Sequence, residues 1–387
     1  MTARITLEAA KGVRGGHAFI WRSAVTQAPG TVKPGDVVEA LDPQGNFVAW
    51  CLWAQTSPIA LRVVSRVAKT QVDDGFWRRR LEAAVARRDS LAGRDAYRVV
   101  HAEADQVPGL FVDRYGQTLV VQTLSEGMNA LKAQLAPVLL ELTGCTRVLA
   151  RDDGSGRDFE GLPREKRWLV GEGSALVEYH EGPAVLAADL MEDAKTGSFL
   201  DQVDNHLRAG ELAHGDGLDA FSYHGGFALS LARRCATVLA LEQDEGAAAR
   251  AQANVTRNGL KNVEVRCANA FDVLRELEKS GRKFGTVVVD PPGLAKRKEG
   301  VKAAERAYRE LNLRAVKLLA PGGVLVTCSC SGKVTREHFE AIVQDAAKDA
   351  KRPLQVLERR GAGLDHPPLL GQPETEYLKA LFLRALD

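Results

Sequence analysis

The 387-residue chain lacks the features that mark membrane, secreted and zinc-binding proteins. No window approaches about 18 consecutive apolar residues, which argues against a transmembrane helix. The first residues, MTARITLEAAKG, lack the apolar core of a secretory signal. The six cysteines form no CxxC pair and no Cys/His cluster with zinc spacing. We therefore expect a cytoplasmic protein that needs no membrane and no metal ion, and in which most cysteines are reduced and structural.

The chain also has little excess of either charge, because its formal net charge is only +2. Its distribution is uneven: residues 1–70 hold eight Lys or Arg against four Asp or Glu. Directly afterwards, the apolar periodicity of residues 75–91 predicts a basic helix. Its arginines outside the apolar face are Arg78, Arg79, Arg87 and Arg88. This bias is compatible with contacts to a phosphate backbone, and it is equally common on the solvated faces of proteins that bind no nucleic acid.

The length suits two or three domains. In residues 1–70, turn signals separate short apolar segments, which is typical of a small β-barrel. The expected strands there include Asp36–Leu41, Phe47–Leu52 and Ile59–Val64. From Tyr97 to about Leu186 strand-like runs surround a helix near Met128–Leu142, and the polar stretch 151–167 is predicted to be a loop.

From about residue 200 onward, strand and helix patterns alternate regularly. Seven strands are expected, at Gly217–Phe221, Val238–Glu242, Val263–Cys267, Thr286–Asp290, Val324–Ser329, Gln355–Glu358 and Tyr377–Leu383. Such alternation predicts an α/β fold, with a doubly wound parallel sheet and helices on both faces. The last two strands lie close together in the sequence, which predicts an antiparallel last strand.

Three strand ends of this sheet carry residues suited to a nucleoside ligand, which binds beyond the carboxyl ends of parallel strands. The first is followed by Phe221–Ser222–Tyr223–His224–Gly225–Gly226, whose paired glycines allow a tight turn and close approach of a ligand. The second ends in Glu242, which can accept hydrogen bonds from both ribose hydroxyls. A phosphate-binding GxGxxG is absent, which argues against NAD. The fourth is followed by Asp290–Pro291–Pro292, a rigid turn because each proline fixes φ and extends the preceding residue.

The series LDAFSYHGGF, Glu242, DPPG and PGGVLVTCSCSG, in this order and spacing, resembles class I methyltransferases. More narrowly, it resembles the RlmI type of ribosomal large-subunit RNA 5-methylcytosine methyltransferase, and the likeness covers nearly the whole chain. Residues 99–116 are similar to that family's central domain. The resemblance implies an N-terminal β-barrel PUA RNA-binding domain (1–72), a mixed α+β central domain (73–185) and a Rossmann-like methyltransferase domain (186–387). It implies large-subunit (23S) ribosomal RNA as the partner; a homodimer is left open.

The resemblance also implies which residues hold the cofactor S-adenosylmethionine. Those around its methionine part are Asp219, Phe221, Ser222, Tyr223, Gly225 and Gly226. Glu242 would hold the ribose, and Asn269 would contact the adenine amine, since an amide oxygen accepts the same hydrogen bond as the Asp usual there. Phe199 and Gln202, in KTGSFLDQ, would lie over the cofactor, as would Asp290. Two positions depart from the family: Val203 replaces an Arg, and Gly293 replaces a Lys or another side chain.

Methylation of carbon 5 of a pyrimidine needs a nucleophile, because a thiolate that adds to carbon 6 raises the electron density at carbon 5. Cys330, in SCSG after the fifth strand of this sheet, is the expected catalytic cysteine, and Cys328 two residues earlier is its rival. Asp290 is expected to bind the base and favour the protonated adduct. Candidate substrate-binding residues are Pro291, Pro292, Tyr308 and His366, and His366 is also the candidate general base.

Three alternatives remain open at this point. The same thiol chemistry would serve carbon 5 of uridine. A strand-terminal Asp-Pro-Pro also suits methylation of an exocyclic amine or ring nitrogen without a covalent intermediate. A protein of another class, a non-catalytic RNA-binding ribosome assembly factor, would not need Asp219, Glu242 and Asp290 together.

Overall fold

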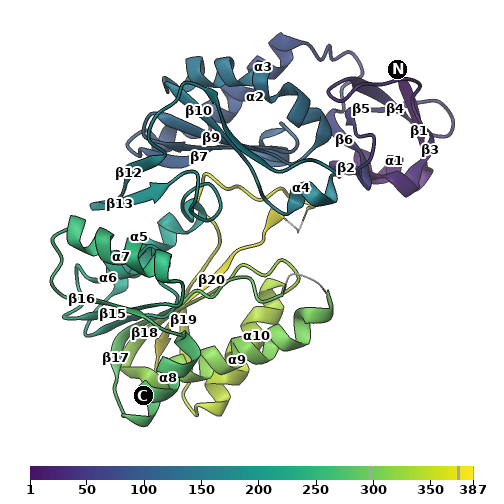
Figure 1. Cartoon of the computed structure of the whole chain (residues 1–387). Helices are drawn as coiled ribbons and strands as arrows, with labels where there is room; N and C mark the ends of the chain where they lie inside the picture. The colour runs from purple at the N-terminus through teal and green to yellow at the C-terminus, as the bar shows by residue number, and fades with distance from the viewer. Residues whose placement is uncertain (296–297, 373–374, 387) are drawn as a thin grey trace. The chain divides into compact units, whose positions relative to one another are not determined.

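The structure is a computed structural model that describes residues 1–295, 298–372 and 375–386 (Figure 1). The chain divides into two units and passes between them several times. Unit 1 consists of Met1–Tyr179, Ala188–Ser198 and Asp365–Gln372; unit 2 consists of His180–Ala187, Phe199–Leu364 and Pro373–Asp387. The division into domains 1–72, 73–185 and 186–387 therefore stays a prediction. None of the helices in the described residues is both long and apolar enough to cross a membrane.

The first part of unit 1 is a six-stranded sheet in the order β2-β6-β5-β4-β1-β3. Its strands are β1 (Thr2–Ile5), β2 (Phe19–Trp21), β3 (Val25–Gln27), β4 (Val37–Leu41), β5 (Phe47–Trp53) and β6 (Ile59–Ser65). Helix α1 (Leu7–Arg14) is capped by Thr6, whose side chain accepts a hydrogen bond from the Ala9 amide. Buried Ile5, Ile20 and Leu61 belong to the core. The three expected strands are present as β4, β5 and β6.

The second part of unit 1 is a five-stranded sheet in the order β11-β10-β9-β8-β7. Its strands are β7 (Ala96–His101), β8 (Leu110–Tyr115), β9 (Thr118–Thr123), β10 (Arg147–Asp152) and β11 (Glu165–Val170). Helices α2 (Asp74–Ala86) and α3 (Glu126–Thr143) pack together on one face of it (Figure 1). The prediction of a loop over residues 151–167 is wrong at both ends, where β10 and β11 lie, and a short helix α4 (Gly156–Phe159) separates these strands.

Unit 2 contains a seven-stranded sheet in the order β16-β15-β14-β17-β18-β20-β19. Its strands are β14 (Gly217–Asp219), β15 (Val238–Glu242), β16 (Val263–Cys267), β17 (Phe284–Val289), β18 (Leu319–Ser329), β19 (Leu354–Arg360) and β20 (Lys379–Ala385). β20 is antiparallel to both of its neighbours, whereas the pairings from β16 through β18 are parallel. The predicted seven-stranded, mostly parallel sheet and its antiparallel last strand are confirmed.

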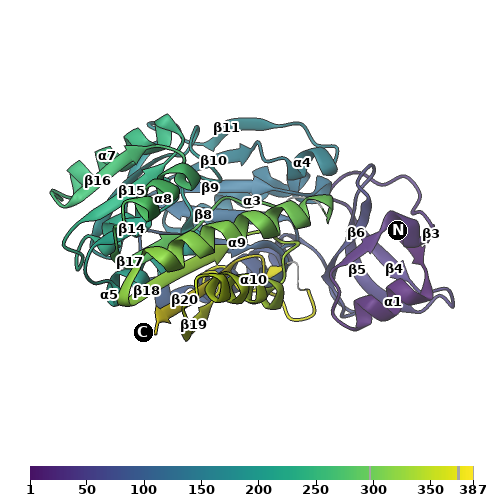
Figure 2. The same cartoon turned by 90° about the horizontal axis from the view of Figure 1, so that it is seen from below.

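Helices cover both faces of this sheet (Figures 1 and 2). One face carries α5 (Val203–Leu212), α6 (Gly226–Leu231) and α7 (Glu245–Arg257), and the other carries α8 (Ala270–Lys279), α9 (Val301–Leu318) and α10 (Arg336–Asp349). Separate hydrophobic cores fill the two faces, with Val326 and Phe382 in one and Leu325 and Leu383 in the other. A two-stranded sheet, β12 (Leu176–Glu181) with β13 (Ala184–Asp189), completes the strands.

Candidate active site

Asp219 ends β14 at the middle of the sheet, and its side chain is fully buried. One carboxylate oxygen, Oδ2, accepts a hydrogen bond from the Ala228 amide of α6 at 3.0 Å. The other, Oδ1, is buried and has no hydrogen-bond partner among the described residues. Burial raises the pKa of Asp219 to about 7 and the charge of Asp290 reinforces this, whereas His206 and the neighbouring Ser222 side chain oppose it. An unused buried carboxylate oxygen is costly unless a ligand satisfies it.

The turn after β14 is held in a conformation that few side chains adopt. Tyr223 has φ +47° and Gly225 has φ +91°, and the Gly225 amide donates to the Ser222 carbonyl at 2.8 Å. The hydroxyl oxygen of Ser222 is buried without a hydrogen-bond partner among the described residues. The ring of Phe199 meets that of Tyr223 edge-on, with centroids 4.8 Å apart. These two aromatic residues and the Ser222 hydroxyl therefore lie together at the carboxyl end of β14.

Gly226 has a packing role that the sequence did not predict. A Cβ at this position would lie 2.4 Å from Cε1 of His206, so only glycine lets α6 approach α5 here. His206 in turn lies with its Nδ1 2.6 Å from Oε2 of Glu181, and its ring packs against Phe227 with centroids 4.4 Å apart. Burial opposes the charged imidazole, but the Glu181 carboxylate outweighs it and raises the pKa of His206. A contact of Gly226 with the cofactor stays a prediction.

Glu242 is the last residue of β15, and Asn269 lies just after β16, as expected. The Glu242 carboxylate accepts hydrogen bonds from the backbone amides of Tyr223 at 2.8 Å, of Gln243 at 2.7 Å and of Asp244 at 2.9 Å. These bonds fix its orientation and leave acceptor capacity on the two oxygens. The amide oxygen of Asn269 caps α8 by accepting from Phe271, so this oxygen already has one partner.

Asp290 follows β17 and faces Gln202. The Gln202 amide nitrogen donates to Oδ2 of Asp290 at 2.8 Å, and the Gln202 oxygen accepts from Asn205 at 2.7 Å. Gln202 is 2% exposed, so this chain of hydrogen bonds is held inside unit 2. Pro291 is buried and Pro292 is exposed, which leaves the second proline of the turn accessible. The predicted Gln202 and Asp290 are thus brought together.

The two candidate cysteines lie in different environments. Cys328 is inside β18, is fully inaccessible, and packs in the same core as Val326 and Phe382. Burial, reinforced by the charge of Asp290, raises the pKa of its thiol well above the ordinary value. Cys330 lies just beyond the end of β18 and is half-buried. Of the two thiols, only Cys330 is accessible to a substrate.

Cys330 lies beside the turn that follows Asp290. Its Sγ is 4.0 Å from the Pro291 carbonyl oxygen, and a Cβ on Gly293 would be 3.6 Å from that sulfur. The glycine that departs from the family pattern therefore leaves room next to the thiol. The two strand ends predicted to carry the chemistry, after β17 and after β18, come together at this sulfur.

The structure corrects the expectation for Tyr308. Its ring is 0% exposed and lies against Phe339, so it offers no face to a base. Its hydroxyl accepts from the Ser329 hydroxyl and bonds the Ser331 hydroxyl, each at 2.9 Å. Tyr308 therefore supports the segment on either side of Cys330 from within the core.

Lys379 is a residue of this region that the sequence analysis missed. It is 2% exposed, pairs across the sheet with Ser329, and its Nζ donates to the carbonyls of Ser331 and Tyr377, both at 2.8 Å. Burial lowers its pKa to about 8, and the charge of Cys330 partly opposes that shift. A lysine in a strand normally indicates a solvent-facing position, so no signal in the sequence pointed to it.

His366 lies in unit 1, whereas Cys328 and Cys330 lie in unit 2. It is 3% exposed, and its Nδ1 is 2.9 Å from Oδ1 of Asp365. The other oxygen of Asp365 accepts from the Arg98 amide at 2.8 Å, and His366 lies 5.3 Å from His101 between ring centroids. These contacts give His366 a structural role within unit 1, and its part in catalysis stays a prediction.

Comparison with known proteins identifies the family of the chain. Residues 161–384 match the family model described as S-adenosylmethionine-dependent methyltransferase, and residues 4–66 match a PUA-like domain. The chain belongs to this methyltransferase family. It is 35% identical to "Ribosomal RNA large subunit methyltransferase I" of Erwinia tasmaniensis, covering 100% of both chains, and 37% identical to the protein of that name from Tolumonas auensis, covering 96% of each. A SAM-dependent methyltransferase structure from Streptococcus mutans shares the fold, with TM-score 0.82 at 15% identity over 99% of this chain and 100% of that one.

The methyltransferase uses S-adenosylmethionine, and the residues present fit that cofactor. S-Adenosylmethionine carries a positive sulfonium and a positive ammonium group, and the strand ends supply the carboxylates of Asp219, Glu242 and Asp290. The unpaired Asp219 Oδ1 is the atom that most clearly needs such a partner. Within residues 1–295, 298–372 and 375–386, no group of three or more His, Cys, Asp or Glu side chains could hold a metal ion.

Proposed function

We propose that this methyltransferase transfers the methyl group of S-adenosylmethionine to carbon 5 of a cytosine in large-subunit (23S) ribosomal RNA, through a covalent adduct with Cys330. The relatives that match over the full length are named for methylation of large-subunit ribosomal RNA, and the PUA-like match supports an RNA substrate. The choice of cytosine rests on the family resemblance.

The cofactor would be held by residues at the carboxyl ends of β14, β15 and β17. Asp219 and Ser222 offer buried, unpartnered oxygens to its amino-acid part, Glu242 offers acceptors to its ribose, and the rings of Phe199 and Tyr223 offer apolar contact. When bound, the cofactor supplies an electrophilic methyl group on a cationic sulfur.

The thiolate of Cys330 would add to carbon 6 of the cytosine, and carbon 5 would then take the methyl group. Loss of the proton from carbon 5 re-forms the double bond and expels the thiolate, so the cysteine is regenerated. Asp290, which accepts from Gln202, would hydrogen-bond the N3 edge or the amine of the base and favour the protonated adduct. His366 stays the candidate base that removes the proton.

The observation that carries this proposal is the contrast between the two thiols. Cys330 is accessible and lies 4.0 Å from the Pro291 carbonyl, next to the Asp290 turn, whereas Cys328 is sealed in the core. A nucleophile must reach carbon 6 while the base is held against the same turn. Such a base has to leave its stack first, which suits an exposed strand end.

The test compares Cys330→Ala with Cys328→Ala in methyl transfer from labelled donor to unmodified large-subunit RNA. We expect Cys330→Ala to lose at least about 1,000-fold in rate, because the adduct cannot form. We expect Cys328→Ala to keep most of the activity after correction for its folded fraction. Mass spectrometry of the labelled nucleoside would distinguish 5-methylcytidine from 5-methyluridine and from N-methylated products.

A second readout uses RNA that contains 5-fluorocytidine. Without a proton on carbon 5 the adduct cannot resolve, so a protein–RNA complex should survive denaturing electrophoresis with the wild type and Cys328→Ala, and not with Cys330→Ala. Normal turnover by Cys330→Ala would rule out the covalent mechanism and favour methylation of an amine or ring nitrogen. Absence of transfer to any RNA by the wild type would favour the non-catalytic assembly factor.

A further inference from the structure

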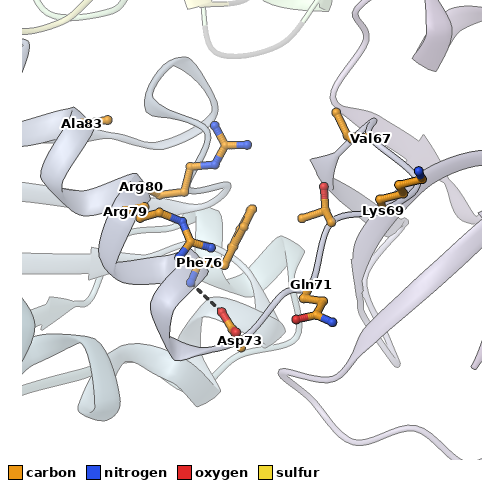
Figure 3. A pocket seen from close by; sticks show the side chains of 9 residues that line it. Val67, Lys69, Gln71, Asp73, Phe76, Arg79, Arg80 and Ala83 are labelled. Atoms are coloured by element: carbon orange, nitrogen blue, oxygen red, sulfur yellow. Dashed lines mark hydrogen bonds between the residues drawn. The ribbon is translucent and has the colours of Figure 1, made fainter.

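A pocket of about 680 Å³ lies in unit 1, where the chain after β6 meets the start of α2. Figure 3 shows Val67, Lys69 and Gln71 of the linker on one side and α2 on the other. The α2 side chains that line it include Phe76, Arg79 and Arg80. The pocket begins just beyond residues 4–66, which match the PUA-like domain.

The other arginines of this helical region have carboxylate partners. Arg78 forms an ion pair with Glu141, and Arg88 lies 2.7 Å from Oδ1 of Asp105. Arg87 reaches the same Asp105 oxygen at 3.1 Å. Arg78 is therefore neutralised, whereas Arg87 and Arg88 share a single carboxylate.

Arg79 and Arg80 differ from them. Among the residues that the structure describes, neither has a carboxylate partner, and the same holds for Lys69 across the pocket. Arg80 donates to the neutral Gln106 side chain and places its guanidinium 5.0 Å from the centroid of the Phe76 ring. Burial, with the charges of Arg87 and Arg79 adding to it, lowers the pKa of Arg80, as expected where cations crowd without anions.

One acid, Asp73, also lines the pocket. Its Oδ1 accepts from the Phe76 amide at 2.7 Å and caps α2, so its role there is local. The three cations, Lys69, Arg79 and Arg80, outnumber this one carboxylate, so the pocket carries a net positive charge. The exposed Val67 side chain and the guanidinium plane of Arg80 add flat or apolar surfaces beside this charge.

We propose that this pocket binds the phosphodiester backbone of the RNA substrate, with Lys69, Arg79 and Arg80 contacting phosphates and the Arg80 plane supporting a flanking base. The inference rests on the proposed function for the identity of the ligand. Arginine pairs with phosphate in a bidentate manner, and guanidinium planes stack on exposed bases. A volume of about 680 Å³ suits one or two nucleotides better than a single inorganic anion.

The test measures binding of a large-subunit RNA fragment without methyl donor, over a range of salt concentrations. We expect Arg79→Gln/Arg80→Gln to weaken binding about tenfold or more and to flatten the plot of log affinity against log salt by about 1.4 to 1.8, because two phosphate contacts are lost. Arg78→Gln is the control: it removes one positive charge from the same helix, at a residue already paired with Glu141, and should change neither quantity.

The proposal that this pocket binds RNA is overturned if the double variant binds RNA as tightly as the wild type. It is also overturned if Arg78→Gln loses as much affinity as the double variant. Competition by millimolar inorganic phosphate as strong as that by RNA would also overturn it, since the site would then be one for free anions. Because methyl donor is omitted, the two proposals fail separately. A wild type that binds RNA through these arginines but transfers no methyl group contradicts only the proposed function. Normal methylation with unchanged KM in the double variant contradicts only the pocket.

Discussion

Two buried carboxylates, one in each unit, are stabilised differently, and Asp152 at the end of β10 in unit 1 is the compensated case. Its Oδ1 accepts from the Thr123 amide at 2.6 Å and lies 3.1 Å from the Arg157 guanidinium. Its Oδ2 accepts from the ammonium of Lys132. Both oxygens are therefore satisfied, and two cations balance the charge. The remaining donors of Arg157 bond the Pro163 carbonyl and the Asn129 side chain.

Asp219 in unit 2 is just as deeply buried, and its bonding is incomplete. One of its oxygens caps α6 and the other has no hydrogen-bond partner among the described residues. The nearby cation, His206, forms its ion pair with Glu181 instead. A fully paired buried charge orders a fold, whereas a buried charge with an unused oxygen at a strand end can accept a ligand. Asp152 and Asp219 are equally buried, and the completeness of their pairing is what differs between them.

The substitution Asp152→Asn should give the largest effect that tests this comparison, a loss of stability of the folded protein. The substitution keeps the shape, leaves the buried Arg157 without its counter-charge and leaves Lys132 with Glu165 as its carboxylate partner, so we expect a loss of about 3 kcal/mol in the free energy of unfolding. Thermal denaturation should show it as a fall of about 8 °C in Tm for the affected transition. Affinity for S-adenosylmethionine should be unchanged in the folded fraction.

The control is Asp158→Asn in the nearby helix α4. Asp158 and its ion-pair partner Arg164 are both exposed, so the loss of this pair should have only a small effect on the free energy of unfolding. An equally small effect from Asp152→Asn would contradict the view that the unit 1 network is structural.

The substitution Asp219→Asn should give the second-largest effect, a loss of affinity for the cofactor. We expect the Kd for S-adenosylmethionine to rise about 30-fold near pH 8, because a charged acceptor is replaced by a neutral amide. In the wild type, affinity should improve as pH rises through about 7, the pKa of Asp219, and isothermal titration calorimetry should show a flat profile in the variant. Asp216→Asn is the control: Asp216 lies just before the same strand, is partly exposed and accepts from the Thr237 hydroxyl, so the Kd should be unchanged.

The stability of Asp219→Asn without cofactor should change in the opposite sense from that of Asp152→Asn. The folded pKa of about 7 lies above the ordinary 3.8, so folding favours the protonated carboxyl. The stabilisation this gives is fully present below pH 3.8 and is lost as pH rises to about 7. Above that pH the variant should therefore be at least as stable as the wild type, and a fall in Tm would show that Asp219 is structural instead.

The same distinction explains what the sequence could predict of the fold. Strands β15 and β16 begin and end at the predicted residues, because their apolar runs are bounded by clear turn signals. β10 and β11 were missed as strands. β10 ends in Arg151 and Asp152, which are buried only because ion pairs compensate them, and β11 is an edge strand that begins with charged Glu165. Hydropathy cannot detect polar residues that are buried by pairing.

For the candidate site, local motifs predicted the residues that lie on strand ends. Asp219, Glu242, Asp290 and Cys330 are where the alternation of strands and helices placed them. The residues that tune them could not be predicted, because Glu181 and Lys379 come from segments far away in the sequence and approach only through the fold.

Substitution of Lys379 should give the smallest of these effects. Lys379 is a buried cation beside Cys330 whose ammonium group donates to two carbonyls, so it tests whether a buried charge is structural or serves the site. In Lys379→Met the positive charge that favours a neighbouring thiolate is gone, so Cys330 should be alkylated by iodoacetamide about tenfold more slowly near neutral pH. A Cys267→Ser background removes the other accessible thiol. Lys379→Arg keeps the charge and should restore most of the reactivity. If Lys379 only satisfies the carbonyls of Ser331 and Tyr377, Lys379→Met should change Tm and leave the pH dependence of alkylation unchanged. Lys379 would then have a purely structural role, like the paired charges of unit 1.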